Sequence, residues 1–197
     1  MKVLALGGSG GMGRFSSYAI SNYSNITKVT IADLNEANAK EFSNHFDDRF
    51  NGIGLDVTDK EHLEKVMSDH DIVLNTTGPF FKFGLPILKS AIKCKCHYFD
   101  ICDDWEPTEE MLKLNDEALK NDITAIVGLG ASPGISNLLG LKAMNELDEA
   151  ESIITGWDVS SAKPEDESSQ KGTNAAMEHG LQPVSYTHLR AHETDHD

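Results

Sequence analysis

Basic residues are scarce in this sequence, and long apolar runs are missing. Only 17 lysines and arginines face 32 aspartates and glutamates in 197 residues, which leaves a formal net charge of −15. A field of that sign repels phosphate, so we expect neither nucleic acid nor an anionic membrane as partner. No apolar stretch approaches the roughly 20 residues of a transmembrane helix, and Gly7 follows the start too soon for a signal peptide. We therefore expect a cytoplasmic protein that holds anionic ligands by local dipoles.

Cysteine is also rare. The three cysteines, Cys94, Cys96 and Cys102, are too few and too close together for a disulfide framework. Cys94 and Cys96 lack the second pair of ligands that a zinc site needs. The spacing of His188, His192 and His196 would align them on one helical face, but no apolar stripe accompanies them. We expect no bound metal.

The histidine row lies in a segment that does not match the rest of the chain. Residues 183–197 resemble a peptide translated from library adapter sequence, of the kind that recurs at the ends of metagenomic reading frames. We therefore exclude them from the fold prediction as a non-native tail. On this interpretation the natural protein continues past Gln182, and the chain is a fragment that is expected to be inactive.

Strand-like and helix-like segments alternate through the first two thirds of the chain. Helical segments include one after the first glycines, with an apolar stripe at Met12, Phe15, Ala19 and Tyr23, and one that a capping box from Thr58 would start. Others cover 36–46, 85–92 and 108–120. Short apolar runs predict six strands, at 2–6, 28–32, 53–57, 71–75, 97–101 and 124–127. This alternation predicts an α/β fold with a Rossmann-type doubly wound parallel sheet.

The pattern changes after Gly134. A helix over 135–147 leads to a strand-like stretch at 152–159 and then to a polar loop at 162–174. We therefore predict three parts: a dinucleotide-binding domain over 1–130, the truncated start of a second α+β domain for substrate binding or dimerisation over 131–182, and the tail.

A glycine-rich loop connects the first strand to the first helix. Gly8, Gly10 and Gly13 have the G-x-G-x-x-G spacing that lets a backbone turn tightly, approach a pyrophosphate and pack a helix closely against a strand. The helix N-terminus then offers N–H groups to the phosphates. A phosphate loop would need Lys-Ser/Thr where Arg14-Phe15 stands. The predicted cofactor contacts in this loop are Gly8, Ser9, Gly10, Gly11, Met12 and Gly13.

An acidic residue ends the second predicted strand, twenty residues after Gly13. The carboxylate of Asp33 is placed to accept hydrogen bonds from ribose hydroxyls, and it would repel the 2′-phosphate of NADP. No Lys or Arg follows directly in Asp33-Leu34-Asn35, so we expect NAD to be favoured over NADP. The alternative is that Asp33 is only a turn residue.

Taken together, these segments resemble the saccharopine dehydrogenase (saccharopine reductase) family. The resemblance is carried by the glycine loop and by further short motifs: Leu55-Asp56-Val57, Asn75-Thr76-Thr77-Gly78-Pro79-Phe80, His97-Tyr98-Phe99-Asp100, Gly130-Ala131-Ser132-Pro133-Gly134-Ile135, and Asn174-Ala175-Ala176-Met177-Glu178-His179-Gly180. It implies NAD or NADP as cofactor and hydride transfer at an imine or secondary amine of an amino acid or polyamine-type substrate.

The resemblance also implies roles for individual residues. Asp56 and Val57 would flank the adenine, and Thr76 and Thr77 would meet the cofactor. Substrate contacts would come from Cys102, Asp103 and Ser132. Saccharopine reductases tend to have Asp where Ser132 stands, and the acidic pair Asp103-Asp104 suits a cationic amine. Each position also has a plainer interpretation, as a turn residue, a solvated acid or, for Cys102, a small apolar filler.

Two alternatives bear on the function. Short-chain dehydrogenase chemistry needs a Tyr-x-x-x-Lys pair, and none of the four tyrosines has a lysine four residues later. A module that only senses NAD or scaffolds a partner would not need the segment after residue 147. We expect the enzyme, with a small-molecule substrate and a fold compatible with a homodimer, and assign no general acid or base.

Overall fold

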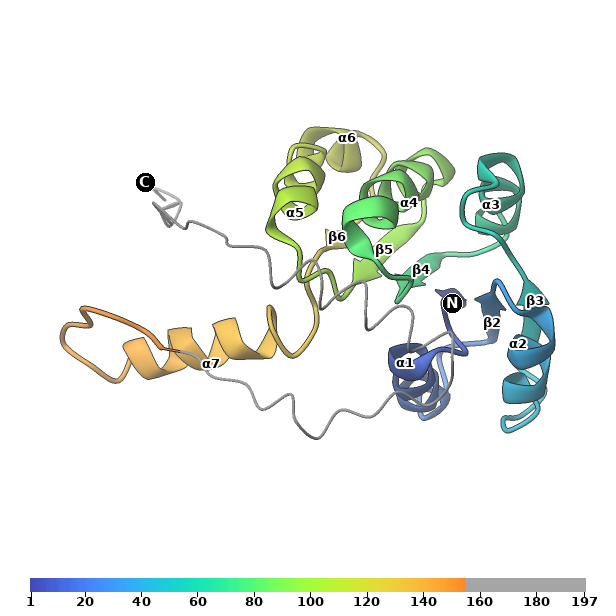
Figure 1. Ribbon diagram of the computed structural model, residues 1–197, viewed down its shortest axis with the longest axis horizontal. Helices are drawn as coiled ribbons and strands as arrows, with labels where there is room; N and C mark the ends of the chain where they lie inside the picture. The colour runs from blue at the N-terminus through green and yellow to red at the C-terminus, as the bar shows by residue number, and fades with distance from the viewer. Residues whose placement is uncertain (155–197) are drawn as a thin grey trace.

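Residues 1–154 are described by a computed structural model, and they form a six-stranded sheet with helices on both faces (Figure 1). All neighbouring strands pair in parallel, in the order β3-β2-β1-β4-β5-β6. This is the strand order of a Rossmann fold, so the predicted fold class is confirmed. The strands are β1 (Lys2–Leu6), β2 (Lys28–Asp33), β3 (Phe50–Gly54), β4 (Ile72–Asn75), β5 (His97–Asp100) and β6 (Ala125–Ile126).

Seven helices are described between and after these strands: α1 (Gly11–Ser21), α2 (Glu36–Ser43), α3 (Lys60–Met67), α4 (Phe80–Cys94), α5 (Trp105–Leu112), α6 (Asn115–Lys120) and α7 (Ile135–Met144). Local side-chain caps define two of the starts. Asn35 accepts a hydrogen bond from the N–H of Asn38 at α2, and Asp59 accepts one from the N–H of His62 at α3. The predicted cap of α3 at Thr58 is therefore wrong by one residue.

The sheet separates two apolar clusters. One face packs against α3, α4 and α5 through residues such as Leu63, Leu88 and Met111, and the other packs against α2 through Ala39 and Phe42. Figure 1 shows the same division, with α1 and α2 on one side and α3 to α6 on the other. Helices on both faces bury most residues of β1 and β2, which explains why these two strands are nearly continuous apolar runs, whereas β3 and β6 are only partly buried.

Several predicted bounds differ from the structure. The stripe of α1 is largely exposed at Met12, Phe15 and Tyr23, and this helix instead buries Gly13 and Ser17. Small residues face the sheet there because the glycine loop brings the helix axis close to it. The third strand begins and ends three residues before its predicted position, and the long helix predicted at 108–120 is divided into α5 and α6.

Helix α7 leaves the sheet and projects away from it (Figure 1). None of its residues is buried, although Ile135, Met144 and its three leucines are apolar. The part of the predicted strand 152–159 that is described, at 152–154, is not a strand, and the rest lies outside the described residues, as do the predicted loop and tail. Among residues 1–154, no helix has the length and apolarity needed to cross a membrane.

Candidate cofactor site

The carboxyl ends of all six strands meet at one edge of the sheet. Neighbouring strands β1 and β4 continue into helices on opposite faces, and in open α/β sheets a crevice at such a switch point receives the ligand. The predicted cofactor and substrate residues lie along this edge, at the end of β2, in the first turn of α1 or in the connections that follow the strands. The fold therefore brings together segments that are far apart in the sequence. The motif spacings predicted each of these segments separately but not their arrangement at one edge.

The glycine loop turns tightly at the end of β1. Gly7 has a φ of +67°, and the N–H of Gly10 donates to the carbonyl of Gly7 over 3.0 Å. A Cβ at Gly13 would lie 2.1 Å from that same carbonyl oxygen, so only glycine lets α1 pack here. Gly10 caps α1 without a side-chain hydrogen bond, and no acidic residue stands in the first turn. The first N–H groups of α1 are thus suited to a pyrophosphate.

The loop after β4 touches the glycine loop. The hydroxyl of Thr76 donates to the carbonyl of Leu6 over 2.8 Å, and a Cβ at Gly7 would lie 3.1 Å from the Thr76 backbone. Thr77 donates its N–H to the Asn75 side chain, while its buried hydroxyl has no hydrogen-bond partner. Both threonines therefore lie beside the glycine loop, and their contact with the cofactor stays a prediction.

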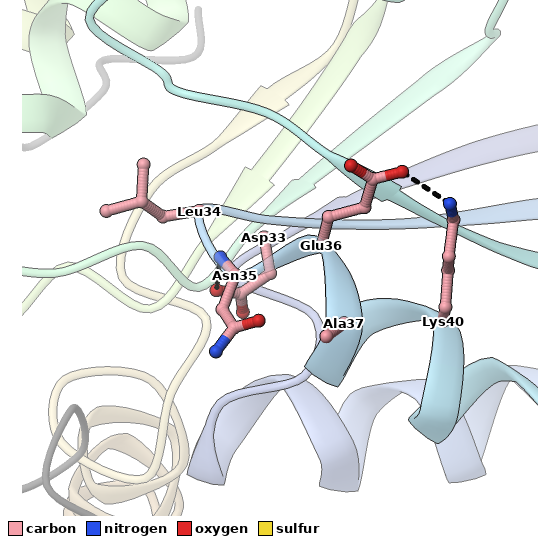
Figure 2. Close-up of a pocket in the computed structure, with 6 residues that line it drawn as sticks. All are labelled: Asp33, Leu34, Asn35, Glu36, Ala37 and Lys40. Carbon is pink, nitrogen blue, oxygen red and sulfur yellow. Dashed lines mark hydrogen bonds and ion pairs between the residues drawn. The ribbon is translucent and has the colours of Figure 1, made fainter.

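The carboxylate of Asp33 is already engaged within the protein. It accepts a hydrogen bond from the buried Ser9 hydroxyl over 2.7 Å and one from the N–H of Asn35 over 3.3 Å. Asp33 also lines an open hollow between the end of β2 and the start of α2 (Figure 2). In this hollow Lys40 forms an ion pair with Glu36 over 2.5 Å, and both side chains are more than half exposed.

Asp56 and Val57 follow β3 at the same edge. Asp56 accepts hydrogen bonds from the N–H and the hydroxyl of Thr58, and these bonds hold the pKa of its carboxyl below the usual range. The side chain thus also serves a local turn, as its plainer interpretation stated. Val57 is half-buried and packs against the larger apolar cluster.

A buried polar network occupies the other half of this edge, and sequence reasoning missed it. The Asn75 amide donates to the Tyr98 hydroxyl over 3.0 Å, and that hydroxyl donates to Asp100 over 2.8 Å. The other oxygen of Asp100 accepts the N–H groups of Cys102 and Gly128, over 3.0 and 2.8 Å. The available signal was the alternation of Tyr and Asp on one face of a buried strand that also neighbours an Asn.

Burial governs the protonation of this network. It raises the pKa of Asp100, although the bonds from Gly128, Cys102 and Tyr98 act in the opposite direction. It also raises the pKa of Tyr98 well above its usual value, and the nearby carboxylate adds to this shift. Tyr98 therefore remains a hydrogen-bond donor at neutral pH.

The predicted substrate residues differ in access. The Cys102 side chain has no exposed surface, and burial raises the pKa of its thiol to about 11, so packing is the role that its surroundings support. Asp103 and Ser132 are exposed at the same edge. Within residues 1–154, no group of three His, Cys, Asp or Glu side chains is arranged to hold a metal ion.

Comparison with known proteins places this geometry in a family. The family model for the saccharopine dehydrogenase NADP-binding domain matches residues 3–126. Among curated proteins, the NADP(+)-dependent, L-glutamate-forming saccharopine dehydrogenase of Saccharomyces cerevisiae is 31% identical over 122 residues, which are 62% of this chain and 26% of that protein. The Schizosaccharomyces pombe counterpart is 28% identical over the same shares. The chain thus spans about a quarter of the length of these relatives.

Solved structures agree with this assignment. Apo saccharopine dehydrogenase (L-Glu forming) from S. cerevisiae superimposes with a TM-score of 0.63 at 29% identity, covering 74% of this chain and 31% of that one. A putative myo-inositol dehydrogenase from Sinorhizobium meliloti shares the fold alone, with a TM-score of 0.53 at 18% identity. These relatives give no support to the NAD preference expected from Asp33, because both the family model and the curated proteins are described by NADP.

Proposed function

The chain belongs to the saccharopine dehydrogenase family, and from this membership we propose that it holds NADP(H) for an oxidoreductase that transfers hydride at a carbon–nitrogen bond. The observation that carries the proposal is the glycine loop between β1 and α1, with Gly10 at the N-cap of α1 and Gly13 packed against Gly7. The nicotinamide ring, when bound, would supply or accept the hydride. The first turn of α1 would hold the pyrophosphate, and Thr76 and Thr77 would border it.

The choice of NADP rests on the relatives and on the hollow of Figure 2. Its lining includes one cation, Lys40, whose ion pair with Glu36 is exposed and therefore weak. A 2′-phosphate can replace Glu36 as the partner of Lys40. Asp33 is bonded to Ser9 and Asn35, which supports a structural role for its carboxylate.

Calorimetric titration of the chain with NADPH and NADH tests both parts of this proposal. We expect NADPH to bind at least tenfold more tightly, and we expect Lys40→Met to remove most of that difference without weakening NADH. Lys60→Met, which removes an exposed lysine on α3, is the matched control. Tighter binding of NADH would overturn only the preference for NADP. Absence of binding of both dinucleotides would overturn the glycine-loop site itself.

The activity proposed for the complete protein is reduction or oxidation at an imine or secondary amine. Exposed Asp103 and its neighbour Asp104 border the site with negative charge, which supports a cationic amine substrate. Turnover of NADPH by a full-length protein with imine substrates tests this activity. Tight cofactor binding without any turnover would favour the sensor or scaffold instead.

We also propose that a second domain begins near residue 131. Its support is α7, whose leucines Leu138, Leu139 and Leu141 are 65, 61 and 55% exposed. Apolar side chains in this number are expected to pack against a core, and residues 1–130 leave them exposed. On this division, substitutions on α7 leave the stability of the first domain unchanged.

A further inference from the structure

Asp100 is the point at which three connections of the site meet. Its side chain accepts the N–H of Cys102, in the connection after β5, and the N–H of Gly128, in the connection after β6. Its backbone carbonyl accepts the N–H of Leu129 over 2.7 Å. Through the Tyr98 hydroxyl it also reaches Asn75 at the end of β4.

Asn75 extends the network to the glycine loop. Its side-chain oxygen accepts the N–H of Thr77 over 3.0 Å. Thr76, next to it, bonds to the Leu6 and Gly7 carbonyls. A chain of hydrogen bonds therefore runs from the glycine loop across β4 and β5 to the connection after β6.

The network is fully buried and has little room to rearrange. Asn75, Tyr98 and Asp100 have no exposed surface. Gly128 has a φ of +76°, and a Cβ there would lie 2.9 Å from the Pro133 ring and 3.2 Å from the Cys102 carbonyl. The connections after β5 and β6 are therefore in direct contact, and one carboxylate oxygen of Asp100 accepts from the backbone of both.

We propose that Asp100 is a positioning residue that holds the connections after β4, β5 and β6 as one unit against the nicotinamide half of the cofactor. The inference rests on the proposed function, because a dinucleotide lying across the switch point places its adenosine over β1 to β3 and its other half over β4 to β6. Asp100 itself is buried and touches neither cofactor nor substrate. It acts through the backbone groups that it holds.

The polarity of the network permits a sharp test. In Asp100→Asn, the new amide and the Asn75 amide both donate to the Tyr98 hydroxyl, whose own proton then has no acceptor. In the double variant Asn75→Asp/Asp100→Asn, the hydroxyl accepts from residue 100 and donates to residue 75. The two bonds of the Tyr98 hydroxyl are then restored in the opposite direction, the N–H groups of Thr77, Cys102 and Gly128 keep oxygen acceptors, and the number of buried charges is unchanged.

Binding of two ligands to the full chain distinguishes the two halves of the site, because NADPH occupies both halves and adenosine 2′,5′-bisphosphate occupies only the adenosine half. We expect Asp100→Asn to weaken NADPH binding about tenfold, to leave adenosine 2′,5′-bisphosphate within twofold of wild type, and to be rescued in the double variant. Equal losses for both ligands, unchanged NADPH affinity, or failure of the double variant to rescue would each overturn the proposal.

Amide hydrogen exchange gives a readout that needs no cofactor. Asp100→Asn is expected to speed exchange at Thr77, Cys102 and Gly128 together, with recovery in the double variant. Acceleration at Cys102 and Gly128 alone would overturn the coupling to β4. If the wild-type chain binds neither ligand, the proposed function fails, while the exchange result still decides whether Asp100 couples the connections.

Discussion

The first and the last helix of the described chain both start from a glycine-rich turn at the carboxyl edge of the sheet, yet one is packed against the sheet and the other is exposed. Helix α1 begins within the run from Gly7 to Gly13 and packs on the sheet, whereas α7 follows the run from Gly128 to Gly134 and buries nothing. The final glycines do not account for the difference, because both meet backbone of their own turn, Gly13 at Gly7 and Gly134 at Gly130 and Gly128. The two helices differ in their packing, since α1 buries Gly13 and Ser17 against the sheet and α7 has no buried residue. Glycine patterns indicate a turn and not the direction of the following helix.

One of the two largest expected effects distinguishes two glycines of the first turn. Gly13→Ala places a Cβ 2.1 Å from the Gly7 carbonyl and should lower the free energy of unfolding by about 3 kcal/mol. Gly10→Ala meets only that carbonyl at 3.3 Å, so it should keep the fold while weakening NADPH binding more than tenfold. Urea unfolding and calorimetry measure the two effects. If Gly10→Ala binds NADPH as wild type does, the loop does not approach the pyrophosphate.

A second pair of substitutions compares the closed core with α7. Leu88→Ala, in α4, removes a side chain that is only 1% exposed and should cost about 2–5 kcal/mol. Leu139→Ala, in α7, removes one that is 61% exposed and should change the unfolding free energy by less than about 0.5 kcal/mol. A comparable loss in both variants would show that α7 belongs to the first domain.

The smallest expected effect is a pH dependence of the free energy of unfolding. It should arise in the core, and substitutions in α7 should not alter it. Burial lowers the pKa of His70, whose ring nitrogens lie 2.8 Å from the Val66 carbonyl and from the Thr30 hydroxyl. The unfolded chain then binds a proton at higher pH than the folded one, so stability should fall as pH drops through 6.5. Urea midpoints between pH 5 and 8 measure this.

One variant tests the histidine and two serve as controls. His70→Gln should flatten the pH dependence, and Leu139→Ala should keep it. His62→Gln, at an exposed position in α3, should also keep it. An unchanged slope in His70→Gln would assign the titration to another group.

Local signals explain which parts of this structure could be predicted. The alternation of strands and helices and the spacing of Gly8, Gly10 and Gly13 depend on neighbours in the sequence, and the structure confirms the fold that they predicted. The buried face of α1 was not predictable from its apolar stripe, because close packing at Gly13 favours small residues there. The stop of β3 at Gly54 was missed for a similar reason, since strand ends depend on pairing with β2.

The candidate site shows the same limit. The glycine loop is made of backbone, and its motif is visible in the sequence. The network of Asn75, Tyr98 and Asp100 joins strands that are more than twenty residues apart, and no local spacing reveals that β4 and β5 are neighbours in this register. Lys40 was missed because its relevance depends on the hollow that it shares with Asp33.

The two buried cysteines give the chain a pair of built-in reporters of local opening. Cys96 precedes β5 and Cys102 follows it, so the thiols lie at opposite ends of one strand. Burial raises both pKa values to about 11, and an alkylating reagent can therefore reach either thiol only after a local fluctuation exposes it. Labelling rates at the two sulfurs would follow the ligand edge and the far edge of the sheet separately, and a bound dinucleotide should slow only Cys102.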